Sequence, residues 1–231
     1  MRALVLGMMA VALVAFGAGA LIASLHTSDA IANAPAVPQM KPFDGERDIA
    51  PFSLTDHHGQ VFDRSRLLGR WTLVTFGFTS CPDACPTMLT NLKELRDALA
   101  PDWQGSAPQF VFVTVDPARD TQAVLAQYVP TFHGEFIGVT GAQAAVDAVH
   151  ADFGGAHRIG PRKHVQADGK THEHYNVDHS VLLYVINPHG RLHLQIAPPF
   201  DPAGVARQIA RFARDFAADR PAVAAAAGGR N

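Results

Sequence analysis

The chain has 231 residues, a formal net charge of −2 at pH 7, and hydrophobic residues at 48% of its positions. No run of basic residues is longer than Arg162-Lys163. The clustered positive charge of a nucleic-acid-binding protein is therefore missing, and we expect no nucleic-acid partner. Cys81 and Cys85 are the only cysteines, so disulfides cannot be the framework of the fold, and a domain of this size does not need them.

An uncharged apolar stretch runs from Ala3 to Leu25. As a helix it would span roughly 34 Å, enough to cross a hydrocarbon core of about 30 Å, so residues 1–25 are predicted to form an N-terminal transmembrane helix. Only Arg2 and the amino terminus carry charge before it, which places the N-terminus in the cytoplasm by the positive-inside rule. The alternative is a signal peptide cleaved near Ala30-Ile31-Ala32, although the apolar region is longer than usual for one. We expect a single-pass protein of the bacterial inner membrane whose remaining domain lies in the periplasm.

Residues 26–44 contain Pro35, Pro38 and Pro42 without a periodic apolar pattern, which predicts a tether between membrane and domain. Residues 45–217 are predicted to form one folded domain. Residues 218–231 are rich in alanine and glycine and are predicted to be a disordered tail.

Within the domain, strand-like and helix-like runs alternate in chain order, which predicts an α/β fold with a mainly parallel sheet covered on both faces. The runs are Trp71–Phe78, Thr87–Leu99, Gln109–Val115, Thr121–Val129, Phe136–Val139 and Ala142–Phe153. Two later strands, Ser180–Ile186 and Arg191–Ile196, are predicted to form a hairpin around Pro188 and Gly190. A last amphipathic helix is predicted over Pro202–Phe216.

The two cysteines lie four residues apart, directly after the first buried strand. Pro86 favours the first position of a helix, so the helix is predicted to begin there with Cys85 at or beside its N-cap. The positive end of the helix should then lower the pKa of Cys85 and favour its thiolate. Both soft-metal binding and disulfide exchange require thiolates, so the turn predicts a metal site or a redox pair.

A structural disulfide is the third possibility for this pair. Outside the cytoplasm an idle pair of thiols is expected to oxidise. A disulfide between residues four apart closes a very short loop and stabilises a fold weakly, which disfavours this interpretation.

Two thiolates alone select poorly for a metal, and histidine is the expected third ligand. Of the twelve histidines, His179 is the best candidate, because it begins a strand and follows Asp178, which could orient its ring. A histidine at a strand end can equally be a hydrogen-bonded structural residue. His172 and His174 could bind a second ion or lie in an exposed loop near Gly169, and Met88 is expected to be a core residue.

Several motifs in the same order resemble those of the Sco/SenC family, copper-binding proteins that help to assemble cytochrome c oxidase. The resemblance covers about residues 45–200. It is carried by Phe52–Asp56 with Gly59, Phe76–Pro86, Val113–Thr121, Leu125–Tyr128, Thr140-Gly141 and Tyr175–Ser180.

The resemblance implies a thioredoxin-like domain with a central mixed sheet, flanking helices and an added β-hairpin, outside a membrane anchor. It implies that Cys81, Cys85 and His179 bind one copper ion, as Cu(I) or Cu(II). Asp178 and Asp116 match supporting positions of the family. The implied partners are the cytochrome c oxidase subunit that carries the CuA site, and other copper chaperones.

Two functions are favoured by the sequence, and a purely structural or docking module is a third if neither copper binding nor redox cycling can be shown. The first is a metallochaperone that delivers copper to the CuA site, which is not an enzyme. The second is a thiol–disulfide oxidoreductase acting on the oxidase cysteines, or in redox defence or signalling, with Cys85 as the nucleophile. The four-residue spacing differs from the Cys-x-x-Cys of thioredoxin catalysts and favours copper.

Overall fold

A computed structural model describes residues 39–99, 103, 105–160, 164–165, 171–172 and 177–227. The chain divides into two units, Met1–Ala36 and Val37–Asn231, and the described residues belong to the second. The predicted membrane anchor and most of the predicted tether lie outside the described residues. Within the described ranges, no helix has the length and apolar character needed to cross a membrane.

An 8-stranded mixed sheet forms the centre of the domain, in the order β1-β12-β11-β4-β5-β6-β2-β3. Pairing is parallel between β4, β5 and β6 and antiparallel at every other interface of this sheet. The mixed sheet is confirmed, whereas the prediction of a mainly parallel sheet is wrong outside these three strands. The strands are β1 (Gln39–Asp48), β2 (Ser53–Asp56), β3 (Val61–Asp63), β4 (Thr72–Gly77), β5 (Gln109–Thr114), β6 (Ile137–Thr140), β11 (Leu183–Ile186) and β12 (Arg191–Ala197).

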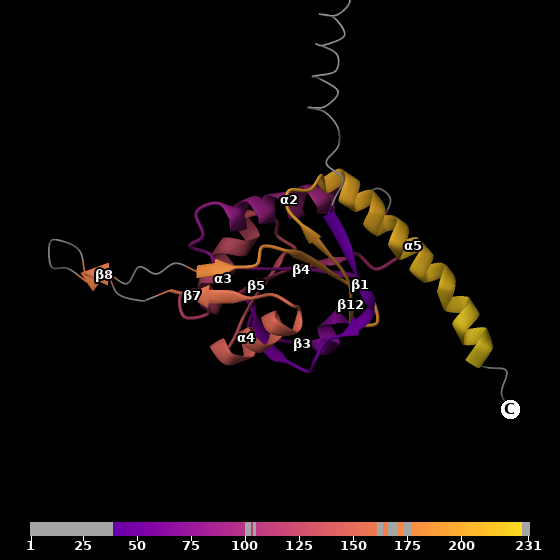
Figure 1. The fold of residues 1–231 in the computed structure, drawn as a ribbon, viewed down its shortest axis with the longest axis horizontal. Helices are drawn as coiled ribbons and strands as arrows, with labels where there is room; N and C mark the ends of the chain where they lie inside the picture. Colours follow the sequence, from indigo (N-terminus) through magenta and orange to yellow (C-terminus); the bar gives the residue numbers. More distant parts are fainter. Residues whose placement is uncertain are drawn as a thin grey trace, which may run out of the picture. The chain divides into compact units, whose positions relative to one another are not determined.

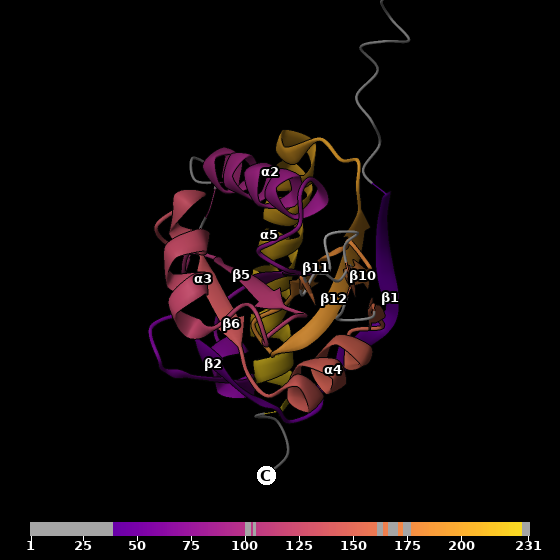
Figure 2. The ribbon, with the colours of Figure 1, turned by 90° about the vertical axis from the view of Figure 1, so that its left-hand side faces the viewer.

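The helices cover both faces of this sheet (Figures 1 and 2). Helices α2 (Ala84–Leu99) and α3 (Gln122–Tyr128) follow successive parallel strands, so right-handed crossovers place them on one face. There α2 packs against α5 (Pro202–Ala227), and α4 (Gln143–Asp152) lies on the other side of the sheet. Two 3-10 turns, η1 (Arg64–Leu67) and η2 (Val129–Thr131), complete the helical segments.

The last helix is longer than expected. Predicted to end at Phe216, α5 continues to Ala227. Alanine has the highest helix propensity of all residues, which favours a continued helix in this alanine-rich segment, although Pro221 lacks the backbone donor that a helix interior uses.

Two short antiparallel ribbons follow α4. Strand β7 (His157–Ile159) pairs with β10 (Val177–His179), and β8 (His164–Val165) pairs with β9 (Thr171–His172). Neither ribbon belongs to the 8-stranded sheet. The β7–β10 ribbon therefore forms an addition to the central sheet, and this addition carries His179.

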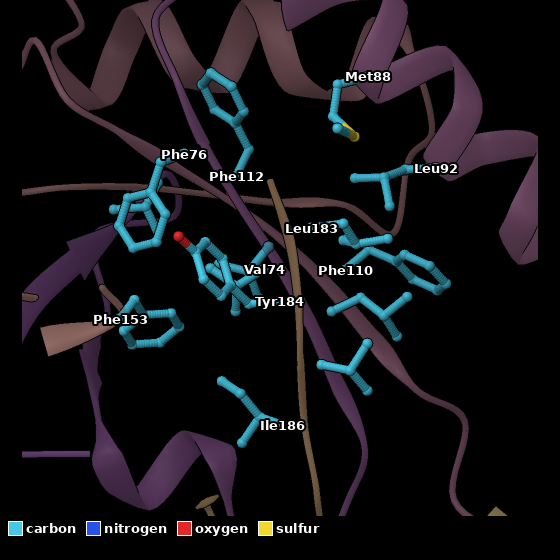
Figure 3. Close-up of a cluster of buried hydrophobic side chains, with 14 of the residues drawn as sticks. Val74, Phe76, Met88, Leu92, Phe110, Phe112, Phe153, Leu183, Tyr184 and Ile186 are labelled. Atoms are coloured by element: carbon cyan, nitrogen blue, oxygen red, sulfur yellow. The ribbon is translucent and has the colours of Figure 1, made fainter. Parts of the chain in front are cut away.

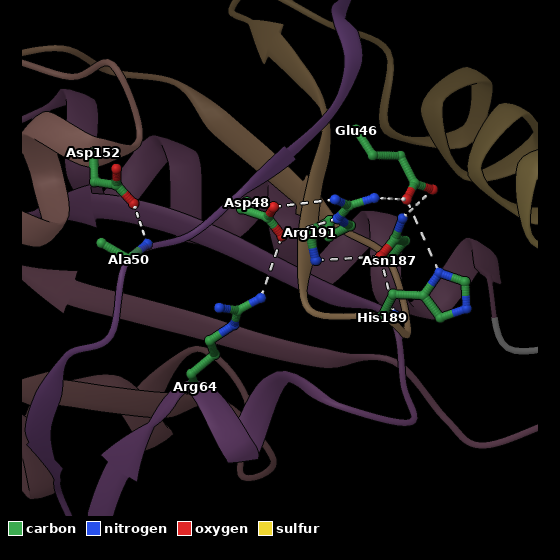
Figure 4. Close-up of polar contacts among 8 residues, drawn as sticks. All are labelled: Glu46, Asp48, Ala50, Arg64, Asp152, Asn187, His189 and Arg191. Atoms are coloured by element: carbon green, nitrogen blue, oxygen red, sulfur yellow. Dashed lines mark hydrogen bonds and ion pairs between the residues drawn. The ribbon is translucent and has the colours of Figure 1, made fainter.

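Strand β1 corrects the predicted tether, because residues 39–44 are part of the sheet. β1 pairs with β12 at the edge, where Pro42 is tolerated, and the register shifts between Pro42 and Arg47. Figure 4 shows the polar contacts that hold this end of β1, among them Arg191 with both carboxylate oxygens of Asp48 at 2.9 and 3.0 Å. These are long-range contacts, invisible in a local sequence pattern.

The core lies on both faces of the central strands (Figure 3). Alternation along each strand places Phe76 and Tyr184 on the face of Phe153, whereas Phe110 and Phe112 lie on the face of α2. Met88 is 3% exposed, which confirms its assignment to the core. The strand β4 is buried at every position, so the loop that follows it leaves from the rigid centre of the domain.

Candidate metal centre

The loop that carries both cysteines joins β4 to α2. The helix begins at Ala84, two residues before the predicted start at Pro86, and the Thr87 amide donates to the Asp83 carbonyl at 3.1 Å. Cys85 therefore lies inside the first helical turn instead of capping it.

Gly77, the last residue of β4, allows Cys85 to lie against the strand. A Cβ at this position would be 2.9 Å from the Cys85 Sγ and 2.6 Å from the Phe112 ring. Such distances are too short for real contacts, so a side chain would displace either the thiol or the ring. The glycine thus fixes how closely the sulfur approaches the sheet.

The two thiols differ in environment. Both cysteines are free, Cys85 is 2% exposed, and Cys81 is partly exposed. The Cys85 amide donates to the Cys81 Sγ at 3.4 Å. The predicted lowering of the Cys85 pKa is wrong: burial raises the pKa of this thiol, although a hydrogen bond from the Phe78 backbone opposes the shift.

His179, at the end of β10, meets Cys85 from the opposite side. Its Nε2 lies 3.5 Å from the Cys85 Sγ, and its Nδ1 lies 3.1 Å from the Ser180 carbonyl oxygen. The carbonyl can only accept, so Nδ1 carries the proton and Nε2 presents a lone pair toward the sulfur. Burial lowers the pKa of His179, which favours the neutral form that binds metals.

This contact has the dimensions of two ligands on one metal ion. Bonds of about 2.0 Å to nitrogen and about 2.3 Å to sulfur, meeting at a tetrahedral angle, separate the two ligand atoms by about 3.5 Å. Across the described residues, no three His, Cys, Asp or Glu side chains already converge as a complete metal site. The structure thus brings Cys85 and His179 into contact, with Cys81 beside them.

Asp178 does not contact the histidine ring in the expected way. Its carboxylate lies 3.3 Å from Arg158, and both side chains are largely exposed. Neighbouring strand residues point to opposite faces, which explains why Asp178 turns away while His179 turns inward. Asp178 raises the pKa of His179 less than the hydrogen bond to the Ser180 carbonyl does.

Asp116 reaches the site indirectly. Its carboxylate, fully buried, pairs with Arg119. The Arg119 guanidinium lies 5.7 Å from the centre of the Phe78 ring, and that ring packs edge-on against His179 at 5.7 Å. The predicted supporting role of Asp116 therefore has a physical path through Arg119 and Phe78.

Asp120 is a site residue that the sequence analysis did not single out. Its buried carboxylate accepts hydrogen bonds from the Thr79 amide at 2.9 Å, the Thr79 hydroxyl at 2.6 Å and the Thr114 hydroxyl at 2.6 Å. Burial raises the pKa of Asp120, and these hydrogen bonds oppose that shift. The sequence feature that could have indicated Asp120 is its position after β5, four residues beyond Asp116. It ties the cysteine loop to the loop that follows β5.

Other histidines have different surroundings. His57, in the turn after β2, is 4% exposed, and its Nδ1 accepts a hydrogen bond from the Gly138 amide at 2.9 Å. His172 lies in β9 opposite His164, and His174 lies outside the described residues. A second metal site at His172 and His174 stays a prediction.

The pattern of the whole domain matches one family. The SCO1/SenC family matches residues 41–214. The chain belongs to the SCO1/SenC family. This confirms the resemblance drawn from the motifs and extends it over β1 and α5.

Similar proteins occur in bacteria and in mitochondria. The chain is 38% identical over 156 residues to "Protein SCO2 homolog, mitochondrial" of Danio rerio, covering 66% of this chain and 53% of that protein. It is 34% identical over 181 residues to the "SCO2-like protein" of Rickettsia felis, covering 78% and 82%. The chain thus spans about half the length of the mitochondrial relative and most of the bacterial one.

Solved structures of Sco proteins share the fold. Yeast Sco1 aligns with a TM-score of 0.64 and 31% identity, covering 72% of this chain and 98% of that one. The Arabidopsis thaliana ScoI structure, described as having copper bound, aligns with a TM-score of 0.63 and 29% identity, covering 72% and 98%. The mixed sheet with flanking helices is therefore the family fold, in agreement with the predicted thioredoxin-like class.

Proposed function

We propose that this protein is a copper chaperone, which binds one copper ion through Cys81, Cys85 and His179 and passes it to the CuA site of cytochrome c oxidase. The observation that carries the proposal is the 3.5 Å contact between the Cys85 Sγ and the His179 Nε2. Sulfur and imidazole nitrogen are ligands that suit copper, and folding brings these two together from positions 94 residues apart.

The relatives support copper as the cargo. Sco structures from yeast and Bradyrhizobium japonicum are described as having copper bound, and each is 31% identical to this chain. The family match over residues 41–214 contains the cysteine loop and β10.

Transfer to a partner requires one ligand that the partner can reach. Cys81 is partly exposed, whereas Cys85 is buried. A thiolate of the acceptor can therefore approach the metal on the Cys81 side and exchange with it. Cys85 and His179 would hold the ion until the acceptor has bound it.

The setting of this reaction follows from the predicted anchor. We propose that residues 1–25 hold the protein in the bacterial inner membrane with the N-terminus inside, that residues 26–38 link this anchor to the domain, and that the domain lies in the periplasm. The partners would be the oxidase subunit that carries the CuA site and a second copper chaperone as donor.

The copper site is tested by titrating Cu(I) and Cu(II) into the reduced wild type, His179→Ala and a matched control, His189→Ala. His189 lies in the turn between β11 and β12, at the far end of β11 from His179. We expect one equivalent of copper in the wild type and control, with sulfur-to-copper charge-transfer absorption that is lost in His179→Ala. Equal affinity and absorption in all three proteins would refute His179 as a ligand.

Delivery is tested by mixing the copper-loaded protein with the metal-free, reduced CuA domain of an oxidase subunit. The expected result is the absorption of a binuclear CuA centre and loss of copper from the chaperone. Loaded protein that keeps its copper against a large excess of the acceptor would contradict a delivery role.

A thiol–disulfide oxidoreductase remains the second candidate, because both cysteines are free and Cys81 is accessible. The burial of Cys85 reassigns the expected nucleophile from Cys85 to Cys81, since the attacking thiol must be reached by the partner. The reduction potential of the Cys81–Cys85 pair decides whether the pair suits thiol–disulfide exchange. A value below about −300 mV would mark a strongly reducing or inert pair, and a less negative value would suit exchange with partners.

A further inference from the structure

His157 lies directly opposite His179 in the β7–β10 ribbon. The ribbon is joined at its base, where the Ser180 amide donates to the Ala156 carbonyl at 2.9 Å and the Ala156 amide donates to the Ser180 hydroxyl at 3.2 Å. It shares no ladder with the 8-stranded sheet. A side-chain contact outside the sheet can therefore help to set where His179 lies relative to the cysteine loop, beside the packing of its ring on Phe78.

The His157 ring makes that contact with helix α4. Its Nε2 lies 3.0 Å from the Asp147 Oδ1, and its Nδ1 lies 2.9 Å from the His150 Nδ1. Asp147 and His150 are three residues apart and so lie on one face of the helix. One ring thus joins the ribbon to α4 at two points, and its side chain is only 10% exposed.

His150 is held in place within the core. It is fully buried and stacks on Phe76 with ring centres 4.3 Å apart. A Cβ on Gly155 would lie 2.1 Å from its Nε2, so the chain can turn this closely only with glycine there. Gly154 adopts φ +79°, and the Gly155 amide donates to the His150 carbonyl at 2.9 Å. This turn reverses the chain after α4, so that the His157 side chain lies against that helix.

One arrangement of protons satisfies the whole chain of contacts. If the His157 Nε2–H donates to Asp147, the neutral His157 ring accepts at Nδ1 and His150 donates from its own Nδ1. Burial lowers the pKa of His150 to about 4, so its ring is neutral near pH 7 and has one proton to donate. The buried Nε2 of His150, which has no hydrogen-bond partner, then carries only a lone pair.

We infer that His157 is a positioning residue for the copper site, holding the ribbon on α4 so that the His179 Nε2 stays against the Cys85 Sγ. The inference rests on the proposed function, because it concerns how one ligand of that site is placed. His157 itself points to α4 and is not a ligand. Replacing a residue that orients a metal ligand typically weakens the metal affinity about 10- to 100-fold.

The test compares His157→Phe, which fills the same space without hydrogen bonds, with His157→Gln, whose amide can both donate and accept. His189→Phe serves as the control for loss of a histidine elsewhere. We expect His157→Phe to bind Cu(II) at least about 10-fold more weakly and to shift the sulfur-to-copper absorption, and His157→Gln to recover most of both. Wild-type affinity and absorption in His157→Phe would overturn the inference.

A readout without copper separates positioning from stability. The ring nitrogen NMR signals of His179 in the metal-free protein report its tautomer and surroundings, and they should change in His157→Phe and return in His157→Gln. Unchanged signals would also overturn the inference. If His157→Phe fails to fold, Asp147→Ala and Asp147→Asn replace it, because Asp147 is half exposed and asparagine keeps the acceptor.

Including His179→Ala in the same titration distinguishes a failure of the positioning role from a failure of the proposed function. Loss of copper in His179→Ala, with none in His157→Phe, would refute the positioning role and leave the proposed function standing. A wild type that binds no copper would refute both.

Discussion

The cysteine loop and the histidine ribbon supply the same site but are held in different ways. The loop leaves the fully buried strand β4 and is tied to the next loop through two hydrogen bonds from Thr79 to Asp120. The ribbon stands outside the main sheet and contacts α4 through the side chain of His157. The difference indicates that the sulfur half of the site is built into the core, while the position of the nitrogen half depends on a few replaceable contacts.

The largest effect is expected on the rigid side. Gly77→Ala should lower the free energy of unfolding by about 3 kcal/mol, because its Cβ overlaps both Phe112 and the Cys85 Sγ. Copper affinity should fall with it as the sulfur moves. Chemical denaturation and copper titration measure the two losses. Gly134→Ala is the matched control, since a Cβ there meets nothing within 4 Å, and comparable losses in both variants would contradict the explanation.

His150, the residue of α4 that the ribbon contacts through His157, should make the stability of the domain depend on pH. With the pKa of His150 lowered from 6.5 to about 4, the unfolded chain binds a proton across this interval that the folded protein does not. Stability should therefore fall as the pH drops from 6.5 to 4, by up to about 3 kcal/mol from this residue. Denaturation curves of His150→Phe should show a smaller loss over the same interval. An identical pH dependence would exclude His150 as a source, and His189→Phe should behave as the wild type.

Asp120→Ala tests the link between the two loops. It leaves the Thr79 amide and two hydroxyls without their acceptor, while it removes a carboxylate whose burial is itself unfavourable. We expect a net loss of about 2 kcal/mol in denaturation and a larger weakening of copper binding than Asp215→Ala produces. Asp215 is exposed on α5, so its removal should change neither quantity. Copper binding unaffected by Asp120→Ala would mean that the cysteine loop holds its shape alone.

The smallest effect is expected at Asp178. Its ion pair with Arg158 joins two largely exposed side chains, and such pairs contribute about 0–1 kcal/mol. Asp178→Ala should therefore change copper affinity less than about threefold, far less than His157→Phe. A tenfold loss would return to Asp178 the orienting role that its place in the sequence first indicated.

Copper binding should strengthen as the pH rises. Burial raises the pKa of the Cys85 thiol, so binding must displace its proton, whereas the lowered pKa of His179 leaves that ring ready to bind. Competition titrations at several pH values should show affinity increasing toward alkaline pH. A flat profile would exclude the Cys85 thiolate as a ligand.

Most elements of the fold were predictable from local patterns. Strands β4, β5 and β6, helices α2, α3 and α4, and the β11–β12 hairpin all lie within a few residues of their predicted bounds. Their hydrophobic periodicity and turn residues depend on neighbours in the chain, and so they can be recognised without the tertiary structure. The cysteine pair was visible for the same reason, and the motif around His179 indicated the third ligand through resemblance.

Other features depend on contacts between distant residues, and only the tertiary structure decided them. β1 becomes a strand because β12 offers it a partner, although Pro42 and the prolines before the strand predict a tether. The pKa of Cys85 rises because the sheet buries it, although the start of a helix predicts the opposite. Asp120 and His157 acquire their roles from Thr79 and from α4, which lie beside them only in the folded chain. Burial and long-range hydrogen bonds arise on folding, so local sequence could indicate the proposed ligands but not the contacts that hold them.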